Sequence, residues 1–184
     1  ETILSGDLDG DDATAFGNVG ENSHRVVTAI GLNATSLLEG VTISGANAGQ
    51  RGAGGLYSKD SSLTIRDCTI MHCSATYGGG IYLTGTGTPV IEKCRIQENR
   101  ANNGAAVCCL QAEQATFKHC AFHRNQQNSS SCRAVYLHDS TVMFERCSFS
   151  ANGGTAVHIY VANVILNDCV LDHANADAVS AFSS

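Results

Sequence analysis

The sequence predicts an all-β protein of 184 residues, folded as a right-handed parallel β-helix of about six to seven coils with three short strands per coil. Two observations carry this prediction. A cysteine-centred motif recurs every 22–27 residues, and each repeat holds three short segments in which apolar and polar residues alternate. A fixed period of this length indicates a solenoid, and the alternation indicates strands. No repeat contains a helix-length apolar pattern, so helical solenoids are disfavoured. Residues 1–184 are expected to form one domain.

One strand of each repeat follows a cysteine that has an apolar residue two positions later. We call these residues the cysteine column: Cys68, Cys94, Cys120, Cys147 and Cys169. Val41 fits the same place one repeat earlier. Because coils stack at about 4.8 Å, the column is expected to line up inside the rod. Buried free cysteine packs as a small hydrophobe, and a straight stack lacks the converging ligands of a zinc site. A core ladder is therefore the interpretation that we favour.

The other two strands lie before and after this motif. The apolar residues three positions before each anchor are Leu38, Ile65, Ile91, Phe117, Phe144 and Leu166. The apolar runs opened by small residues are 55–58, 80–83, 106–109, 134–137, 156–159 and 178–181. Two positions before the anchors, the outward residues are Glu39, Arg66, Glu92, Lys118, Glu145 and Asn167. Opposite charges on neighbouring strands attract weakly, so this alternation of sign predicts a ladder that fixes the register of the coils.

Composition excludes several classes of function. The net charge of −6 argues against a nucleic-acid partner, because nucleic-acid binders cluster Lys and Arg. No apolar run approaches the roughly 20 residues of a membrane-spanning helix. The hydrophobic fraction of 43% is enough for a packed core, so the chain is not expected to be disordered.

Short motifs resemble a known family. Phe122-His-Arg-Asn125 and Phe149-Ser-Ala-Asn152 look like the FxxN half of the repeats in polymorphic outer membrane proteins, and Gly78-Gly-Gly-Ile81 resembles the GGA-I half. More broadly, the chain is similar to right-handed β-helix repeat regions of bacterial surface proteins with a pectin-lyase-like fold. The resemblance implies a secreted or cell-surface setting and an adhesive or structural role. The asparagines Asn99, Asn125 and Asn152 are expected to hydrogen-bond turn backbone between coils.

An acidic insertion, residues 7–24, interrupts the first repeat. It opens with the carboxylates Asp7, Asp9, Asp11 and Asp12. Closely spaced carboxylates can converge on a hard cation such as Ca²⁺, although the spacing departs from that of an EF-hand. Structural Ca²⁺ and a solvated loop are the two alternatives, and no other cofactor is expected.

Two sets of side chains outside the core pattern are candidates for contacts or reactivity. An outward column, here called the tyrosine column, contains Tyr57, Tyr82, Cys108, Tyr136, His158 and Ser180. Its rings, Tyr57, Tyr82, Tyr136 and His158, are candidates for stacking glycans or for contacting a protein partner. Cys73, Cys108 and Cys132 fall outside the cysteine column and are expected to be reactive or paired. Cys109, next to Cys108, should point inward.

The predicted function is a non-catalytic structural or adhesive module at the cell surface or outside the cell. Polysaccharide-degrading β-helix enzymes need paired carboxylates or a basic residue beside a metal, and the outward columns show no such cluster. The alternative is a carbohydrate-binding or polysaccharide-degrading protein of pectin-lyase-like fold. Both ends of the repeat array are expected to be uncapped. Unpaired strand edges recruit further strands, so the expected partners are end-to-end copies of the chain, which would build a fibre, or other surface proteins.

Overall fold

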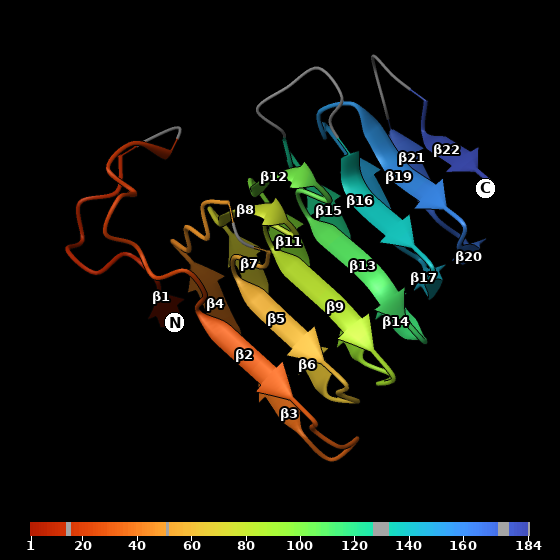
Figure 1. The fold of residues 1–184 in the computed structure, drawn as a ribbon, viewed down its shortest axis with the longest axis horizontal. Helices are drawn as coiled ribbons and strands as arrows, with labels where there is room; N and C mark the ends of the chain where they lie inside the picture. The colour runs from red at the N-terminus through yellow and green to blue at the C-terminus, as the bar shows by residue number, and fades with distance from the viewer. Residues whose placement is uncertain (14–15, 51, 127–132, 173–176, 184) are drawn as a thin grey trace.

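A computed structural model describes residues 1–13, 16–50, 52–126, 133–172 and 177–183, which form a parallel β-solenoid of about six turns (Figure 1). Strands of successive turns pair in parallel and in register as three main sheets, which confirms the predicted fold class. The first sheet contains β1 (Thr2–Ser5), β4 (Val41–Ser44), β7 (Thr69–Met71), β11 (Arg95–Gln97), β15 (Ala121–His123), β18 (Ser148–Ser150) and β21 (Val170–Asp172).

The other two main sheets complete each turn. The second sheet contains β3 (Leu37–Glu39), β6 (Thr64–Arg66), β10 (Val90–Glu92), β14 (Ala115–Lys118), β17 (Thr141–Glu145) and β20 (Asn163–Asn167). The third sheet contains β2 (Val27–Ile30), β5 (Leu56–Lys59), β9 (Ile81–Gly85), β13 (Val107–Ala112), β16 (Arg133–His138), β19 (Thr155–Tyr160) and β22 (Val179–Phe182), which lie side by side across Figure 1. Two coils carry a fourth short strand that the repeat pattern did not predict, β8 (Ser74–Tyr77) and β12 (Arg100–Asn103), and these two pair with each other.

The predicted columns are confirmed by the pairing register. Ile70 of the first sheet pairs with Ile43 on one side and Ile96 on the other. In the second sheet, Phe117 pairs with Ile91 and Phe144. All six side chains are fully buried. Period-2 alternation therefore sends the same face of every coil into a common core.

Phenylalanines fill the core of the later coils. Phe122 stacks on Phe149 at a ring-centroid distance of 4.5 Å, and Phe117 stacks on Phe144 at 5.0 Å. The two stacks meet edge to face, with Phe122 and Phe144 5.8 Å apart. Offset stacks and edge-to-face contacts are the arrangements that aromatic rings prefer, so this cluster joins the first and second sheets across the core.

An asparagine ladder closes the turns after the first sheet, as the sequence predicts. The Asn125 amide donates from Nδ2 to the Ile96 carbonyl at 2.8 Å, and the Asn125 backbone N–H donates to Asn152 Oδ1 at 2.9 Å. Asn99 repeats this pattern one coil earlier, and its Oδ1 accepts from the backbone N–H of Cys73 at 3.0 Å. Cys73 therefore occupies the asparagine position of its coil, and its backbone continues the ladder.

Single left-handed residues make the corners between the second and first sheets. The corner residues and their φ angles are Asp67 (52°), Lys93 (53°), His119 (53°), Arg146 (52°) and Asp168 (51°). Such φ values cost a non-glycine residue about 1–3 kcal/mol and persist only where the surroundings enforce them. Here the paired strands on both sides do so, since each corner repeats in register.

The outward charges next to these corners form part of the predicted ladder. Arg66 Nε lies 2.7 Å from Glu39 Oε1, and Lys118 Nζ lies 3.7 Å from Glu145 Oε2. The pKa of the Glu39 carboxyl is lowered by its hydrogen bond to Arg66. Solvent screens such pairs, so their main effect is on register rather than stability.

Candidate functional site

The acidic insertion folds around the Asp7 side chain. Its Oδ1 accepts from the backbone N–H of Gly10 at 2.7 Å and of Asp11 at 3.3 Å, and its Oδ2 accepts from Asp12 N–H at 3.3 Å. Gly10 has a φ of +72°, a conformation that glycine adopts without strain. The insertion lies beside β1 at one end of the stack of coils (red in Figure 1), and it contacts the coils where Asn47 Nδ2 donates to the Val19 carbonyl at 2.7 Å. The turn thus holds the carboxylates of this segment in fixed positions.

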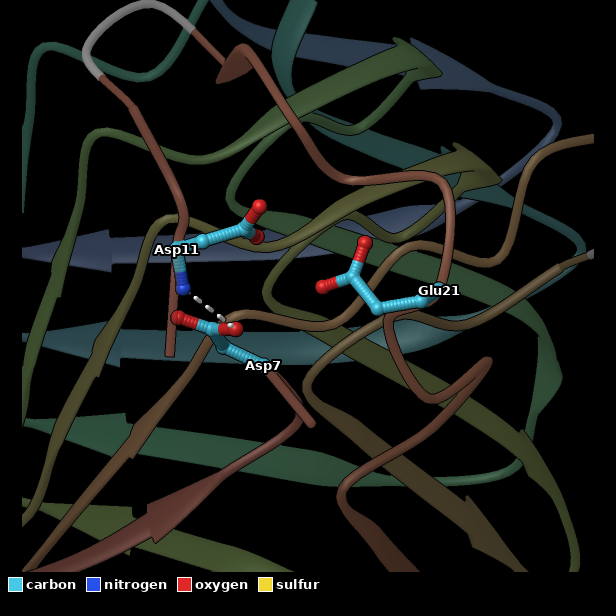
Figure 2. A group of neighbouring side chains, drawn as sticks. All are labelled: Asp7, Asp11 and Glu21. Carbon is cyan, nitrogen blue, oxygen red and sulfur yellow. Dashed lines mark hydrogen bonds between the residues drawn. The ribbon is translucent and has the colours of Figure 1, made fainter. Parts of the chain in front are cut away.

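Three carboxylates of the insertion converge. Asp7, Asp11 and Glu21 each offer an oxygen, and these oxygens all lie within 4.8 Å of one another. Figure 2 shows the three side chains around a common space. Glu21 Oε1 is buried and has no hydrogen-bond partner among the described residues. Like charges at this distance repel, and a hard divalent cation with oxygen ligands would relieve the repulsion. The arrangement can therefore hold Ca²⁺.

The converging set differs from the four aspartates that the sequence predicts. The structure brings Asp7 and Asp11 together but leaves Asp9 exposed and outside the group. Asp12 is outside it as well, because its carboxylate accepts two hydrogen bonds from Asn22 Nδ2 at 3.1 and 3.0 Å. Glu21 takes the third position. The sequence indicated Glu21 only through its position inside the predicted insertion, residues 7–24.

The tyrosine column runs in register along the outer face of the third sheet. Tyr57 pairs with Tyr82, Cys108 lies between Tyr82 and Tyr136, and Tyr136 is followed by His158 and then Ser180. Tyr57 stacks on Tyr82 with centroids 5.6 Å apart, and Tyr136 stacks on His158 at 5.5 Å. These rings turn their faces toward neighbouring coils, so their edges are directed away from the sheet.

Arginines and a second row of rings extend this surface. The Arg25 guanidinium lies 4.5 Å from the Tyr57 centroid, and that of Arg133 lies 5.4 Å from Tyr136. Cation–π contacts of this kind cover ring faces that would otherwise be open. In the neighbouring outward column His138 stacks on Tyr160 at 5.0 Å. We call the tyrosine column and these flanking side chains the aromatic face.

Partial burial changes the titration of the aromatic face. Burial raises the pKa of Tyr82 to about 12 and also raises that of Tyr136. Burial lowers the pKa of His158, and the Arg133 charge adds to this effect. His158 Nδ1 is 2.8 Å from Ser180 Oγ. At neutral pH Tyr82, Tyr136 and His158 are therefore uncharged beside the arginine charges.

The predicted reactive thiols lie in different surroundings. Cys73 and Cys108 are fully buried free thiols, and Cys132 lies outside the described residues. Burial raises the pKa of Cys73 to about 12 and also raises that of Cys108. Cys108 points outward as predicted, yet it is covered because it lies between the larger rings of Tyr82 and Tyr136. Thiolates are the reactive form, so the structure does not favour reactivity at either buried thiol.

A shallow cavity beside the asparagine ladder contains a single carboxylate. Its volume is 280 Å³, and the described residues that line it are Phe16, His72, Glu98, Asn99, Arg100, Arg124 and Gln126. Glu98 lies 2.9 Å from His72 Nε2 and 3.6 Å from Arg124 Nη1. These contacts, led by the hydrogen bond to His72, lower the pKa of the Glu98 carboxyl. A glycosidase needs two carboxyl groups, one of them a proton donor with a raised pKa. This cavity offers neither among the residues that are described.

Comparison with known proteins adds a family but no close relative. A family model described as "Right handed beta helix region" matches residues 8–132 and 54–184. No curated protein matches the chain significantly. Within the described ranges, no helix has the length and apolarity that crossing a membrane requires.

Proposed function

Because the chain belongs to the right-handed beta helix family, we propose that it is a non-catalytic structural or adhesive module of a secreted or cell-surface protein. In this role the coils form a rigid rod and the aromatic face is the surface that contacts the partner. The observation that carries the proposal is the set of stacked ring pairs on the outer face of the third sheet, on both sides of Cys108. A fold alone does not fix a function, so the argument rests on this surface.

The orientation of the rings favours a protein partner over a glycan. A sugar ring needs an open aromatic face to stack on, but Tyr57 is stacked by Tyr82 and also covered by Arg25. Likewise, His158 stacks on Tyr136, and Arg133 covers the Tyr136 ring. Tyrosine and arginine side chains are instead enriched at protein interfaces. For the carbohydrate alternative, Phe182 remains as a ring on which a sugar could stack, because this residue is 55% exposed.

Binding arrays test this proposal. The purified domain is applied to an array of extracellular-matrix and cell-surface proteins and to a glycan array, beside the variant Tyr57→Ser/Tyr136→Ser. A matched control, Arg95→Ser, changes an exposed residue of β11 in the first sheet. We expect protein binding that the double variant loses and the control keeps. Binding to glycans alone, or release of reducing or unsaturated ends from polysaccharides, would overturn the proposal.

Copies of the chain are the second candidate partner. Parallel strands accept a further strand wherever an edge is unpaired, so association would run along the axis of the rod. Sedimentation velocity over a range of concentrations tests this: growing linear species support it, and a single species at every concentration counts against it.

We further propose that Asp7, Asp11 and Glu21 bind Ca²⁺ and so fasten the acidic insertion. The convergence of their oxygens within 4.8 Å supports this, together with the buried Glu21 Oε1 that lacks a partner among the described residues. Calcium takes six to eight oxygens, so water and backbone carbonyls would complete the shell. Isothermal titration calorimetry with CaCl₂ tests the site. The absence of a heat of binding in the wild-type chain would contradict this proposal.

A further inference from the structure

The cysteine column places one thiol in each of five successive coils. The backbone N–H that follows each anchor donates to the carbonyl of the preceding anchor at 2.9 Å, as Arg95 does to Cys68 and Ala121 does to Cys94. The cysteines therefore stand directly above one another at the coil spacing of about 4.8 Å. The first four are buried and Cys169 is partly exposed, and all five are free thiols.

The thiol protons are not needed to satisfy the backbone. Each Sγ lies 3.2–3.5 Å from the carbonyl oxygen two residues earlier, as Cys94 does from Glu92. That same carbonyl already accepts a backbone N–H from the corner of the preceding coil; Asp67, for example, donates to Glu92 at 3.1 Å. Each of these carbonyls therefore keeps a backbone donor when the thiol proton is lost. Each sulfur also lies 3.4–3.7 Å from a carbonyl oxygen of the preceding coil.

The spacing of the column matches a two-coordinate metal. A metal–thiolate bond is about 2.3 Å long, taking the zinc value as a guide, so two bonds in line span about 4.6 Å. This is close to the coil spacing of about 4.8 Å. The cysteine side chains point across the axis of the rod, whereas the gaps between neighbouring sulfurs run along that axis. A metal ion in a gap would therefore make the bent C–S–metal angle that thiolates adopt. Four converging ligands, which zinc requires, are absent from such a stack of described residues.

We propose that the cysteine column binds soft monovalent cations of the Cu(I) class, each in a gap between two neighbouring sulfurs, with two ions among its five sulfurs because one sulfur cannot bond in line to metals on both sides. Thiolates are the ligands that select Cu(I). Each ion displaces one proton, RSH + M⁺ → RS–M + H⁺, and the neighbouring sulfur completes the linear pair through a lone pair. Two ions replace two protons, three thiols stay protonated and the column stays neutral. No oxidation or reduction takes place.

The alternative is that the column is only a packing device. Free cysteine is a common small core residue, and Val41 occupies the same column in the coil before Cys68, since the paired residues that follow them are Thr42 and Thr69. Valine therefore serves as the matched substitution, because the fold already tolerates it at this place. A packing role predicts that no ion binds in the gaps.

Counting bound copper in column variants separates these possibilities. Every protein carries Cys132→Ser, so that the thiol outside the described residues does not contribute. The folded, reduced chain is equilibrated anaerobically with Cu(I) supplied as its acetonitrile complex, desalted and assayed for copper and released protons. We expect about two ions and two protons per chain. Cys94→Val isolates Cys68 and leaves three adjacent thiols, which hold one pair, so the count should fall by half, to one. Cys68→Val leaves four adjacent thiols, which form two pairs, and should keep the count of two.

The two variants remove one thiol each, so independent thiols would lose the same amount in both. Equal losses, or no copper in the wild-type chain, would overturn the proposal. Cys73→Ala is the control, since Cys73 lies in the asparagine column with no thiol neighbour there, and it should keep the wild-type count. Thermal melts supply a second readout: copper should raise the melting temperature of the wild-type chain, whereas a fall would mean that copper prefers the unfolded thiols.

Discussion

The middle coils and the acidic insertion are stabilised in opposite ways. In the middle coils a side chain meets its own equivalent one coil away, as Phe122 meets Phe149 and Asn125 meets Asn152. In the insertion the contacts are unrepeated, as in the turn around Asp7. Repetition couples each position to two neighbours, so a change in the coils spreads, while a change in the insertion stays confined. The difference places stability in the repeats and responsiveness to ligands in the insertion.

The largest effect should come from the aromatic core. Phe122→Ala removes a ring that touches three other phenylalanines, and a buried Phe→Ala change costs about 3–5 kcal/mol through lost burial and the cavity left behind. Urea unfolding followed by circular dichroism measures this. Phe182→Ala, at an exposed ring, is the control. Equal effects of the two variants would show that the core is not the main source of stability.

The asparagine ladder should give the next largest effect. Asn125→Ala leaves the Ile96 carbonyl and the Asn99 backbone N–H without their partner, and each buried polar group left unpaired costs about 1–3 kcal/mol. The same urea experiment applies, with the exposed Asn167→Ala as control. If both variants unfold at the same urea concentration, the ladder has no energetic role.

Calcium should act on the insertion and leave the middle coils unchanged. At ten times its Kd, a bound ligand stabilises the state that holds it by about 1.4 kcal/mol. Hydrogen exchange in residues 7–24 should therefore slow on adding Ca²⁺, while exchange in β11 and β15 stays constant. Glu21→Gln should abolish the response, and Asp9→Asn should keep it, because Asp9 lies outside the converging group. A calcium response that is lost in Asp9→Asn but kept in Glu21→Gln would contradict the converging group and favour the aspartates predicted from the sequence.

The smallest effect should be a dependence on pH at the aromatic face. The pKa of His158 is lowered in the folded state, so below the ordinary value of about 6.5 the unfolded chain binds more protons than the folded one. Stability should therefore fall as the pH drops through 6.5 toward the lowered pKa. His158→Phe should flatten this part of the curve in urea melts. His119→Asn, at an exposed corner residue, should leave the slope unchanged, and a slope that survives in His158→Phe would contradict the assignment.

The sequence predicts the coils well because their rules are local. Alternation fixes which face of a strand is buried, and the repeat length fixes which residues stack, so the columns of Ile70 and Phe117 follow directly. The insertion obeys no such rule. Glu21 joins Asp7 and Asp11 because the chain folds back on its own start, where the Ser23 N–H donates to the Gly6 carbonyl at 2.7 Å, and spacing alone does not reveal this. The burial of Cys108 likewise depends on the size of its tyrosine neighbours, a property of three coils together.

The direction of the backbone hydrogen bonds has a mechanical consequence. Each strand bonds to its equivalent in the next coil, so these bonds point along the rod. A force along the rod would break the hydrogen bonds between one pair of neighbouring coils at a time, rather than shear many bonds at once. Each interface that opens would release one repeat of 22–27 residues as slack chain. Under tension the rod would then lengthen in small steps. These steps would absorb mechanical work before the protein detaches from its binding partner.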